Sequence, residues 1–452
     1  MFSHGGFVQL LVKRIYEWAR TDQRRYSLSF FTMGNTCSNH LGIPPAKGPN
    51  AVGCTDFMMD HTAQGTFFRL YYPCQETEKA EKPDWVPSRE YFNGLADFMK
   101  INRTLSERIF SYLFGPFKIP AYLDAPFKSS GKCPVVIFSH GLGAFRYTQY
   151  VFNIAIIFAH DKLEVLFTCS ANISLMLPRT LYSAICAELA SQGFIVASVE
   201  HRDQSASATF YFREKTESEK ANGKMAKTQD STQDDLVKVW MYYRALHHGE
   251  SEFPLRSKQV KQRADECIMA LDKLTEINSG IPAQNVLRTQ FDWTTLENSM
   301  DLCRIAAMGH SFGGATVIEA LCKEVKFKCG IALDAWMFPL DDETFPRVKQ
   351  PIFFINSEKF QWAGNISRMK KLDSAVIQRK MITIRGTVHQ SFPDFTFLTG
   401  NWIGKLMKLK GEIDPEVAID LSNKATLAFL QRHLGKKNKE LTIVSNSCQH
   451  QV

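Results

Sequence analysis

The sequence predicts an α/β fold in which a mainly parallel central sheet is flanked by helices. Short apolar runs typical of buried strands alternate with helical patterns, and polar residues able to do chemistry directly follow several of the runs. One run, 305–308, meets a helical pattern through the glycine-flanked turn GHSFG at 309–313. A strand, a GxSxG turn and a helix in succession form the nucleophile elbow of the α/β-hydrolase fold, which is the specific fold that we expect.

Length and composition fit one large globular domain. The chain has 452 residues, 44% of them hydrophobic, which is enough for a sizeable core. Its net charge of +8 is spread without a block of like charges, so we expect no nucleic-acid partner, although a basic balance favours weak attraction to anionic membrane surfaces. The 11 cysteines show neither a CxxC pair nor zinc-finger spacing, and an odd number cannot all pair within one chain. This indicates a reducing compartment.

We expect one domain with additions at both ends and one inside. Residues 1–32 are basic with apolar residues at helical spacing, but the apolar run is too short and interrupted for a secretory signal. An organellar presequence is the alternative. We interpret these residues as a poorly ordered extension. The hydrolase domain then spans 33–438, contains an insertion at 147–179, and is followed by a polar tail at 439–452.

A lipidation pattern lies at 33–38, where MGNTCS fits the acceptor sequence for N-myristoylation. If translation begins at Met33, Gly34 takes that acyl chain and Cys37 takes a second, reversible one, which together give the two signals that stable anchoring requires. In the chain as written the motif is internal and inert, and coincidence is the alternative explanation.

In chain order, the first elements are a turn-rich stretch at 44–54 and a strand with alternating large side chains at 65–74. Between Phe92 and Phe114, apolar residues fall on a helical stripe with lysine and arginine interleaved. Packing against the core and contact with a membrane face are equally good explanations of such a basic amphipathic helix.

A buried strand at 135–138 leads into the turn SHGLG at 139–143. A His-Gly turn after a strand, upstream of the nucleophile, is the usual place of a second oxyanion donor, and we assign that donor to the backbone NH of Leu142. An ordinary strand-to-loop turn is the alternative. Residues 147–179 follow, rich in Phe, Ile and Leu but without an amphipathic period, and their charged residues keep each apolar run below the ~18 residues of a membrane span. We interpret them as an inserted segment, of the kind that alternative splicing adds, directly behind the oxyanion loop.

The rest of the chain continues the alternation. The expected helices are 181–191, 235–246 and 256–277, and the expected strands are 194–199, 329–333, 351–355 and 381–384. Parallel strands joined by right-handed crossovers bring their carboxyl ends to one edge of the sheet, where we expect the site.

Ser311 in the GxSxG turn is the expected nucleophile. A serine needs a histidine to take its proton and a carboxylate to orient that histidine, in the order Ser, acid, His along this fold. His389 lies in a loop just after a late strand, the right place; the other histidines precede the serine, belong to a late helix or lie in the tail. Asp334 and Glu358 each follow a strand, and position alone does not separate them.

Four motifs carry a family resemblance: SHGLGAFR, GHSFGGATV, LDAWMFP and PIFFINSEKFQ. The chain resembles the platelet-activating factor acetylhydrolases, most closely the intracellular type II enzyme, from about Gly34 onward apart from the insertion. The resemblance implies that the catalytic residues are Ser311, Asp334 and His389, so it selects Asp334 over Glu358. It also implies that the NH groups of Leu142 and Phe312 form the oxyanion hole.

The same resemblance implies a calcium-independent serine hydrolase with no metal or cofactor. Its substrate would be a phospholipid such as platelet-activating factor, from which it releases acetyl or short, oxidised acyl groups at the sn-2 position through an acyl-enzyme. We expect a cytoplasmic monomer, with lipidation at Gly34 and reversible membrane association through the stretch from Leu105 to Phe114 and that from Phe397 to Met407.

Two alternatives stay open. The first is a broader carboxylesterase or acylglycerol lipase on the same fold, because a catalytic triad determines the reaction class and not the leaving group. The second is a catalytically impaired, membrane-associated splice variant, because the insertion at 147–179 lies behind the oxyanion loop.

Overall fold

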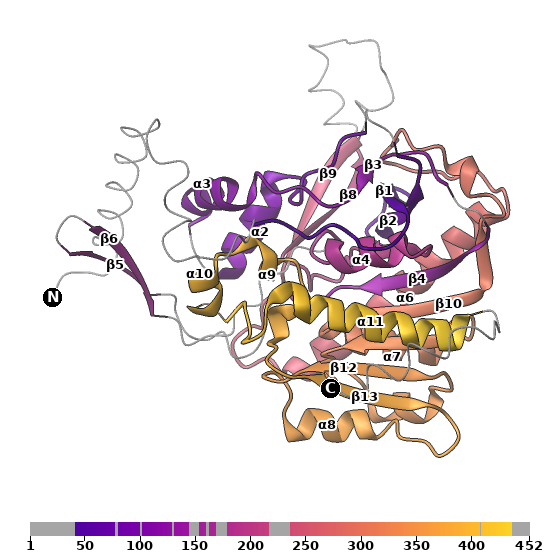
Figure 1. The fold of residues 1–452 in the computed structure, drawn as a ribbon. Helices are drawn as coiled ribbons and strands as arrows, with labels where there is room; N and C mark the ends of the chain where they lie inside the picture. Colours follow the sequence, from indigo (N-terminus) through magenta and orange to yellow (C-terminus); the bar gives the residue numbers. More distant parts are fainter. Residues whose placement is uncertain are drawn as a thin grey trace, which may run out of the picture.

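A computed structural model describes residues 41–76, 80–99, 102–128, 131–143, 153–159, 162–168, 179–216, 236–406 and 408–435 (Figure 1). Its centre is a nine-stranded sheet with the order β13-β12-β11-β10-β4-β7-β2-β1-β3. The strands from β13 to β7 in this row run parallel to one another, whereas β2 is antiparallel to both of its neighbours. The prediction of a mainly parallel sheet flanked by helices is confirmed.

The strands of the main sheet are β1 (Ala51–Met58), β2 (Phe67–Cys74), β3 (Tyr122–Leu123), β4 (Cys133–Ser139), β7 (Ile195–Val199), β10 (Met300–His310), β11 (Cys329–Leu333), β12 (Ile352–Ser357) and β13 (Arg379–Ile384). Two antiparallel pairs stand apart from it, β5 (Asn153–Ala159) with β6 (Lys162–Thr168) and β8 (Ala208–Glu214) with β9 (Leu236–Tyr242). The α-helices are α2 (Arg89–Met99), α3 (Arg103–Phe114), α4 (Ser183–Ser191), α6 (Glu252–Asn278), α7 (Phe312–Lys323), α8 (Ala363–Lys370), α9 (Phe395–Leu398), α10 (Asn401–Leu406) and α11 (Pro415–Leu434).

Strand β4 shows how the sheet is buried on both faces. Val136 and Phe138 belong to the apolar cluster that contains residues of α4 and α11, whereas Val135 and Ile137 belong to the cluster of α6 and α7. Successive side chains of a strand point to opposite faces, so a strand covered on both sides is apolar at every position. The continuous apolar run at 135–138 has this cause.

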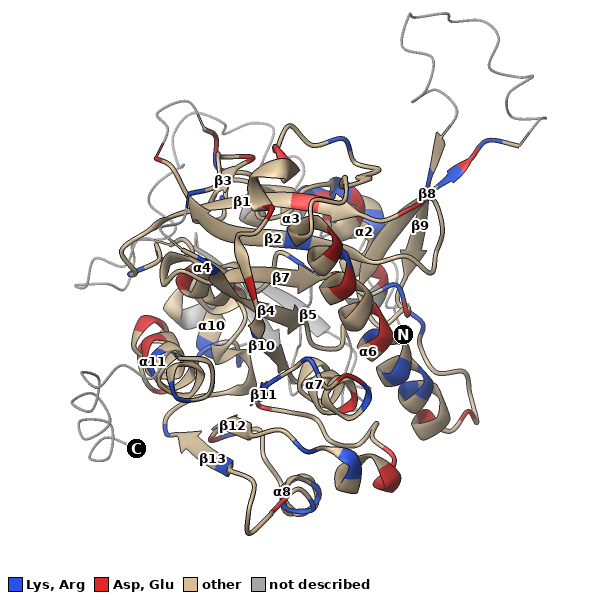
Figure 2. Ribbon diagram, turned by 90° about the vertical axis from the view of Figure 1, so that its right-hand side faces the viewer, with Lys and Arg blue, Asp and Glu red and all other residues tan. Residues whose placement is uncertain are grey.

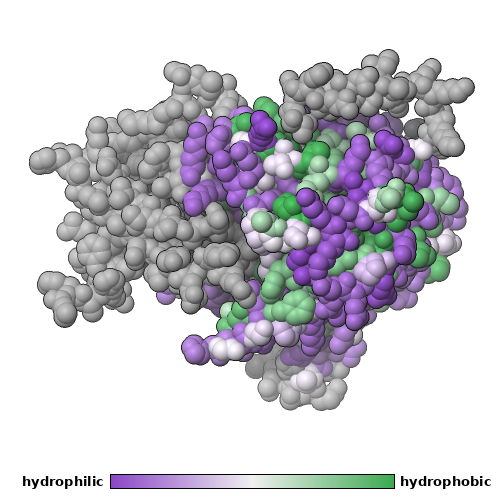
Figure 3. Space-filling view, turned by 90° about the horizontal axis from the view of Figure 1, so that it is seen from below, coloured by the Kyte–Doolittle hydropathy of each residue, from purple (hydrophilic) through white to green (hydrophobic). Residues whose placement is uncertain are grey.

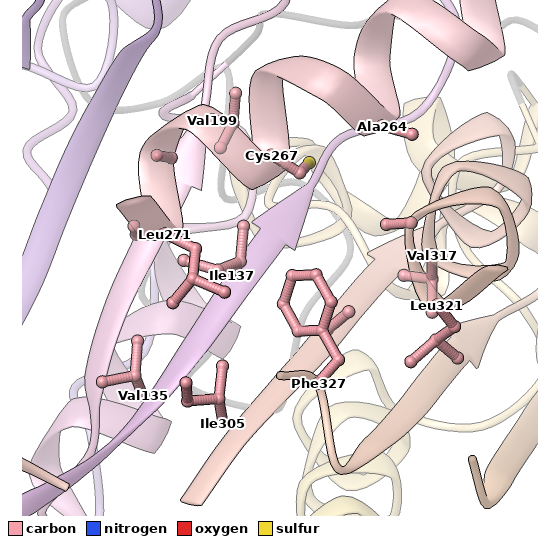
Figure 4. Packing of buried hydrophobic residues seen from close by; sticks show 14 of the residues in the cluster. Val135, Ile137, Val199, Ala264, Cys267, Leu271, Ile305, Val317, Leu321 and Phe327 are labelled. Atoms are coloured by element: carbon pink, nitrogen blue, oxygen red, sulfur yellow. The ribbon is translucent and has the colours of Figure 1, made fainter. Parts of the chain in front are cut away.

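Helices α6 and α7 cover the second face of the sheet (Figure 4). Leu271 of α6 and Leu321 of α7 pack with Phe327 against strand residues that include Ile305. Complete burial of one such side chain contributes about 1.5–3 kcal/mol to stability. This layer holds the start of α7, where the serine turn lies, against β10.

The predicted helix at 235–246 is wrong, because Leu236–Tyr242 is the strand β9. Its sequence LVKVWMY is rich in β-branched and aromatic residues, which suit a strand. It pairs antiparallel with β8, and Trp240 lies opposite Phe210 with 5.1 Å between ring centroids. Cross-strand aromatic pairs of this kind stabilise a strand, and a window of local sequence does not contain the partner.

Two other elements differ in extent from the prediction. The helical stripe from Phe92 to Phe114 belongs to two helices, α2 and α3, that pack through the rings of Phe92 and Phe110, with 6.0 Å between centroids. The turn-rich stretch 44–54 contains the beginning of β1. The remaining expected elements are present as β2, β4, α4, β7, α6, β10, α7, β11, β12 and β13.

The outer helices carry both charge signs. Acidic and basic residues are interspersed along α6 and α11 (Figure 2). On the face drawn in Figure 3, hydrophilic residues predominate and the hydrophobic groups between them are small. Within the described ranges, no helix has the length and apolar character needed to cross a membrane.

Candidate active site

The register of the central strands brings four loops to one edge of the sheet. Ser139 at the end of β4 pairs with Gly309 of β10, and His310 at the end of β10 pairs with Leu333 of β11. Leu333 in turn pairs with Ile355 of β12. The loops after these strands therefore begin side by side at the carboxyl edge, where ligands bind in sheets of this kind.

Ser311 occupies a strained corner between β10 and α7. Its backbone has φ 59° and ψ −115°, a left-handed conformation that is uncommon for a residue with a Cβ. A Cβ at Gly309 or at Gly313 would lie closer than 3.0 Å to backbone atoms, those of Gly313 and Ser139 respectively. The turn therefore requires glycine at both positions. Ser311 is buried, and its Oγ has no hydrogen-bond partner among the described residues.

The carboxylate of Asp334 is fully buried and accepts four hydrogen bonds. Its Oδ1 accepts from the backbone NH of Ser357 at 3.0 Å and from Nε2 of Gln361 at 2.7 Å. Its Oδ2 accepts from Oγ of Ser357 at 2.6 Å and from Nδ1 of His389 at 2.7 Å. The histidine ring is thus oriented by a carboxylate that is itself held in place.

Glu358, the other acid that the sequence offers, lies elsewhere. Its carboxylate accepts from the backbone NH of Gly386 at 2.6 Å and lies 3.6 Å from Nζ of Lys359. These contacts lower the pKa of Glu358, first through the hydrogen bond from Gly386. The structure therefore brings Asp334, and not Glu358, to His389.

The ring of His389 is held between two other rings. Phe360 stacks on it with 3.7 Å between centroids and an interplanar angle of 20°, and the ring of His310 packs against it at 4.4 Å. Because His310 directly precedes Ser311, this packing brings His389 to the serine corner. A nucleophile, a histidine and an orienting carboxylate gathered in this way can perform acyl transfer.

The oxyanion loop, residues 140–143, is tied down from several sides. The NH of Gly143 donates to the carbonyl of Ser205 at 2.8 Å, and the NH of Gly141 donates to the hydroxyl of Tyr182 at 3.2 Å. Leu142 lies between these two tethered residues and is fully buried. Phe312 is the first residue of α7, so its NH points out of the positive end of the helix.

A buried cation lies behind this loop. Nη2 of Arg263 donates to the carbonyl of His140, and its guanidinium carbon lies 4.6 Å from the ring centroid of Phe312. Burial, together with the charge of Arg263, lowers the pKa of His140 and of His201 well below the usual value. Burial raises the pKa of Glu266, which contacts Nδ1 of His201 at 2.6 Å, to about 8. Arg263 is therefore a positive charge whose neighbouring histidines stay neutral.

One group within the described ranges has the spacing of metal ligands. His310, Asp334 and His389 present ligand atoms within 4.8 Å of one another. The Nδ1 atoms of both histidines are engaged, by the hydroxyl of Tyr182 at 2.8 Å and by Asp334 at 2.7 Å. These hydrogen bonds account for the cluster as part of the serine site.

Comparison with known proteins identifies the family. The model for the family described as platelet-activating factor acetylhydrolase, isoform II, matches residues 35–159 and 172–450. The chain belongs to this family.

Two members of this family resemble the chain over most of their own length. A platelet-activating factor acetylhydrolase of Gallus gallus is 52% identical over 397 residues, which are 87% of this chain and 84% of that protein. One of Bos taurus is 48% identical over 393 residues, 87% and 77% of the two chains. Among solved structures, a ferulic acid esterase from Streptomyces cinnamoneus has a TM-score of 0.56 and 16% identity over 90% of this chain and 97% of that chain, which shows the α/β-hydrolase fold alone.

Some residues that matter for the candidate site were not found from the sequence. Ser357 and Gln361, which hold Asp334, lie inside the motif PIFFINSEKFQ, so that motif contains their signal. Tyr182 and Arg263 give no local signal, because each meets the oxyanion loop across a long separation in the chain.

Other predictions fall on parts of the chain that lie outside the described residues. These are the extension at 1–32 with Gly34 behind it, the tail at 439–452, and the side chains of Leu105, Trp402 and Met407. The described ends of the two membrane stretches are buried: Phe114 is 7% exposed and Phe397 is 6% exposed. Of the insertion, β5, β6 and Arg179 are described, and the family match leaves out residues 160–171. Arg179 is buried and forms ion pairs with Asp56 and Glu200, so the last residue of the predicted insertion is part of the core. The bounds of the insertion, like those of the domain, stay predictions.

Proposed function

We propose that this protein is a calcium-independent serine hydrolase that releases the sn-2 acetyl group of platelet-activating factor, and short or oxidised acyl groups of related phospholipids. The observation that carries the proposal is the 2.7 Å hydrogen bond from Nδ1 of His389 to the buried carboxylate of Asp334, beside a strained serine corner. Membership of the acetylhydrolase family, with relatives that bear this activity in their names, supports the choice of substrate.

In the proposed mechanism, Oγ of Ser311 attacks the sn-2 carbonyl carbon as Nε2 of His389 takes the hydroxyl proton. Asp334 holds the histidine in the required tautomer and stabilises the imidazolium that forms. The tetrahedral intermediate collapses to an acyl-enzyme while His389 returns its proton to the departing lysophospholipid oxygen. Water, deprotonated by the same histidine, then attacks the acyl-enzyme and releases the carboxylate.

The oxyanion of each tetrahedral intermediate is proposed to bind the NH groups of Leu142 and Phe312. Removal of one such donor lowers turnover by about 10²–10³-fold. All these groups belong to the protein, so we expect the rate to be the same with calcium and with a calcium chelator.

Ser311→Ala is the direct test. We expect the variant to lose acetate release from a 1-alkyl-2-acetylglycerophosphocholine and to lose labelling by a fluorophosphonate probe. Ser299→Ala is the matched control, because the Ser299 hydroxyl donates at 2.7 Å to the carbonyl of Leu296 at the opposite end of β10. Acetate release by Ser311→Ala at the rate of the unaltered protein would contradict the proposal.

The insertion favours one second candidate, a catalytically impaired variant of the same family. Residues 160–171, which the family match omits, lie in the connection that follows the oxyanion loop. Fluorophosphonate labelling of the full chain beside a chain without 147–178, which keeps the buried Arg179, separates the two. Labelling of both chains supports an active enzyme, and labelling of the shorter chain alone supports the impaired one. If both chains are active, the rates at which they hydrolyse acetyl and long-chain sn-2 esters distinguish an acetylhydrolase from a broader esterase or lipase.

We also propose that the protein is a cytoplasmic monomer that binds membranes reversibly through the outer face of α3 and through α10. Tyr112 of α3 is 74% exposed, and Arg108 on the same helix is exposed as well. The buried ring of Phe114 contacts Phe395 of α9 at 5.4 Å, which joins α3 to the segment before α10. Tyr112→Ser should weaken sedimentation with anionic vesicles while hydrolysis of a soluble ester stays unchanged; equal sedimentation of both proteins would contradict this face. Light scattering tests the monomer.

The lipidation proposal concerns a chain that begins at Met33. Expressed with an N-myristoyltransferase, that chain should incorporate myristate at Gly34, and Gly34→Ala should not. Incorporation into the Gly34→Ala chain would refute the assignment.

A further inference from the structure

Tyr182 lies at the centre of the site without belonging to the residues that the mechanism uses. It immediately precedes α4 and is fully buried. Its ring packs against Phe138 at the end of β4, with 4.9 Å between centroids, and against the ring of His310, at 5.5 Å. Its hydroxyl oxygen lies 3.2 Å from the NH of Gly141 and 2.8 Å from Nδ1 of His310.

The backbone NH of Gly141 can only donate, so the oxygen of Tyr182 accepts there. The hydroxyl and Nδ1 of His310 share a second hydrogen bond, whose direction is set by the tautomer of the ring. Burial keeps that ring neutral, since it lowers the pKa of His310 well below the usual value. The hydroxyl thus joins the Gly141 peptide to a neutral ring that packs 4.4 Å from the ring of His389.

The start of α4 is itself anchored to the histidine loop. Asp394 follows His389 in the same loop, and its buried carboxyl group accepts from the NH of Ser183 at 2.8 Å and from the NH of Ala184 at 3.1 Å. Trp85 adds a third donor at 3.2 Å. An acceptor on the free NH groups of a first helical turn holds that turn in place, so Tyr182 has little freedom to move relative to His389.

We propose that Tyr182 is a positioning residue of the hydrolase: its hydroxyl holds the Gly141 peptide next to Leu142 and the His310 ring next to His389, and so keeps the oxyanion hole and the general base aligned with Ser311. The inference rests on the proposed function. It assigns to one hydroxyl the coupling between two parts of the site that lie far apart in the chain.

Removal of the hydroxyl leaves the NH of Gly141 and Nδ1 of His310 without this partner in a buried place. The oxyanion donor beside Gly141 is then displaced but not deleted, so the loss should be smaller than that for a missing donor. We expect kcat to fall about 10–100-fold, against about 10²–10³-fold for removal of a donor. KM should change less than threefold, because no contact with bound substrate is removed.

Tyr182→Phe is the test, and Tyr71→Phe is its matched control. Tyr71 is also fully buried, and its hydroxyl contacts Oγ of Ser183 at 3.2 Å, one residue along the same segment. Both variants should have lowered melting temperatures. Only Tyr182→Phe should have a lower kcat with an unchanged KM and slower labelling by a fluorophosphonate. A kcat of Tyr182→Phe within twofold of the unaltered protein, or equal losses in both variants, would overturn the proposal.

A double-mutant cycle keeps the test sharp if Tyr182→Phe folds poorly. His310→Gln removes the other side of the contact, and if the two residues act as a unit, the double variant should be no slower than the slower single variant. If the fold-loss in kcat of the double variant equals the product of the two single losses, Tyr182 and His310 act independently and the coupling is refuted. Failure of the proposed function is distinguishable, because it would leave the unaltered protein without Ser311-dependent acetate release, whereas failure of this inference leaves that activity intact and insensitive to Tyr182→Phe.

Discussion

Asp334→Asn removes a charge and exchanges one acceptor for a donor while the side chain keeps its shape. The carboxylate receives four donors, two on each oxygen. An asparagine has a single oxygen, so its NH2 group must face the donors on one side. The outcome depends on which side tolerates the NH2 group better.

The geometry makes one orientation clearly better. If the NH2 group replaces Oδ1, it meets the backbone NH of Ser357, which cannot become an acceptor, and a buried unpaired donor costs about 1–3 kcal/mol. If it replaces Oδ2, the hydroxyl of Ser357 can rotate to accept, and Nδ1 of His389 accepts by moving its proton to Nε2. The second arrangement should therefore predominate about 5–150-fold. It leaves a proton on the nitrogen that must take one from Ser311.

We expect Asp334→Asn to lower kcat by about 10⁴-fold, the size seen when an orienting aspartate of a serine triad is replaced in this way. The assay is acetate release together with the rate of fluorophosphonate labelling. Glu358→Gln is the control, since that carboxylate contacts Gly386 and Lys359 and should be within twofold of the unaltered protein. A loss of less than tenfold in a folded Asp334→Asn variant, or a larger loss in Glu358→Gln, would refute the reasoning.

Two further predictions concern packing and pH. Gly313→Ala places a Cβ closer than 3.0 Å to the backbone of Ser139, so it should destabilise the protein by about 1–3 kcal/mol and abolish fluorophosphonate labelling. Gly364→Ala is the control, because its Cβ meets nothing nearer than 3.5 Å and should change neither stability nor labelling. Equal denaturation midpoints of the two variants would contradict this prediction. Burial raises the pKa of Asp394 to about 8, so the folded chain keeps a proton that the unfolded chain has lost. Stability should therefore fall as pH rises between about 4 and 8, by up to about 1.4 kcal/mol per pH unit relative to Asp394→Asn, and then level off. If urea denaturation gives the unaltered protein and Asp394→Asn the same change in the free energy of unfolding with pH across this range, the carboxyl of Asp394 is already ionised in the folded protein and the prediction is wrong.

The architecture was predictable wherever local sequence determines it. The run at 305–308, the turn at 309–313 and the helix after it specify strand, corner and helix within a few residues, and the structure agrees. Strand β9 has β-branched and aromatic residues that favour a strand locally, and the helix prediction missed them; its pairing with β8, which lies outside any local window, adds to that preference. The same limit applies to α2 and α3, whose packing through Phe92 and Phe110 requires two helices instead of one.

The site divides along the same line. The position of His389 after a strand followed from the order of elements, but position left Asp334 and Glu358 equal, because both follow parallel strands of one sheet edge. The family resemblance selected Asp334, and the three-dimensional arrangement gives the physical reason: the carboxylate of Asp334 contacts Nδ1 of His389 at 2.7 Å, whereas that of Glu358 binds the NH of Gly386. The proposed role of Tyr182 was not predictable from the sequence, because it depends on contacts with residues that are distant along the chain.

The connection from β4 to α4 has a consequence for how this chain tolerates added length. Its two ends are held independently, β4 by pairing with β7 and β10, and the first turn of α4 by Asp394. The entropy of closing a loop between fixed ends grows with the logarithm of its length, by about 0.6 kcal/mol for each doubling. Extra residues at this place therefore change the free energy of folding little, so a gene can acquire an exon here and still encode a folded protein whose turnover is a separate matter.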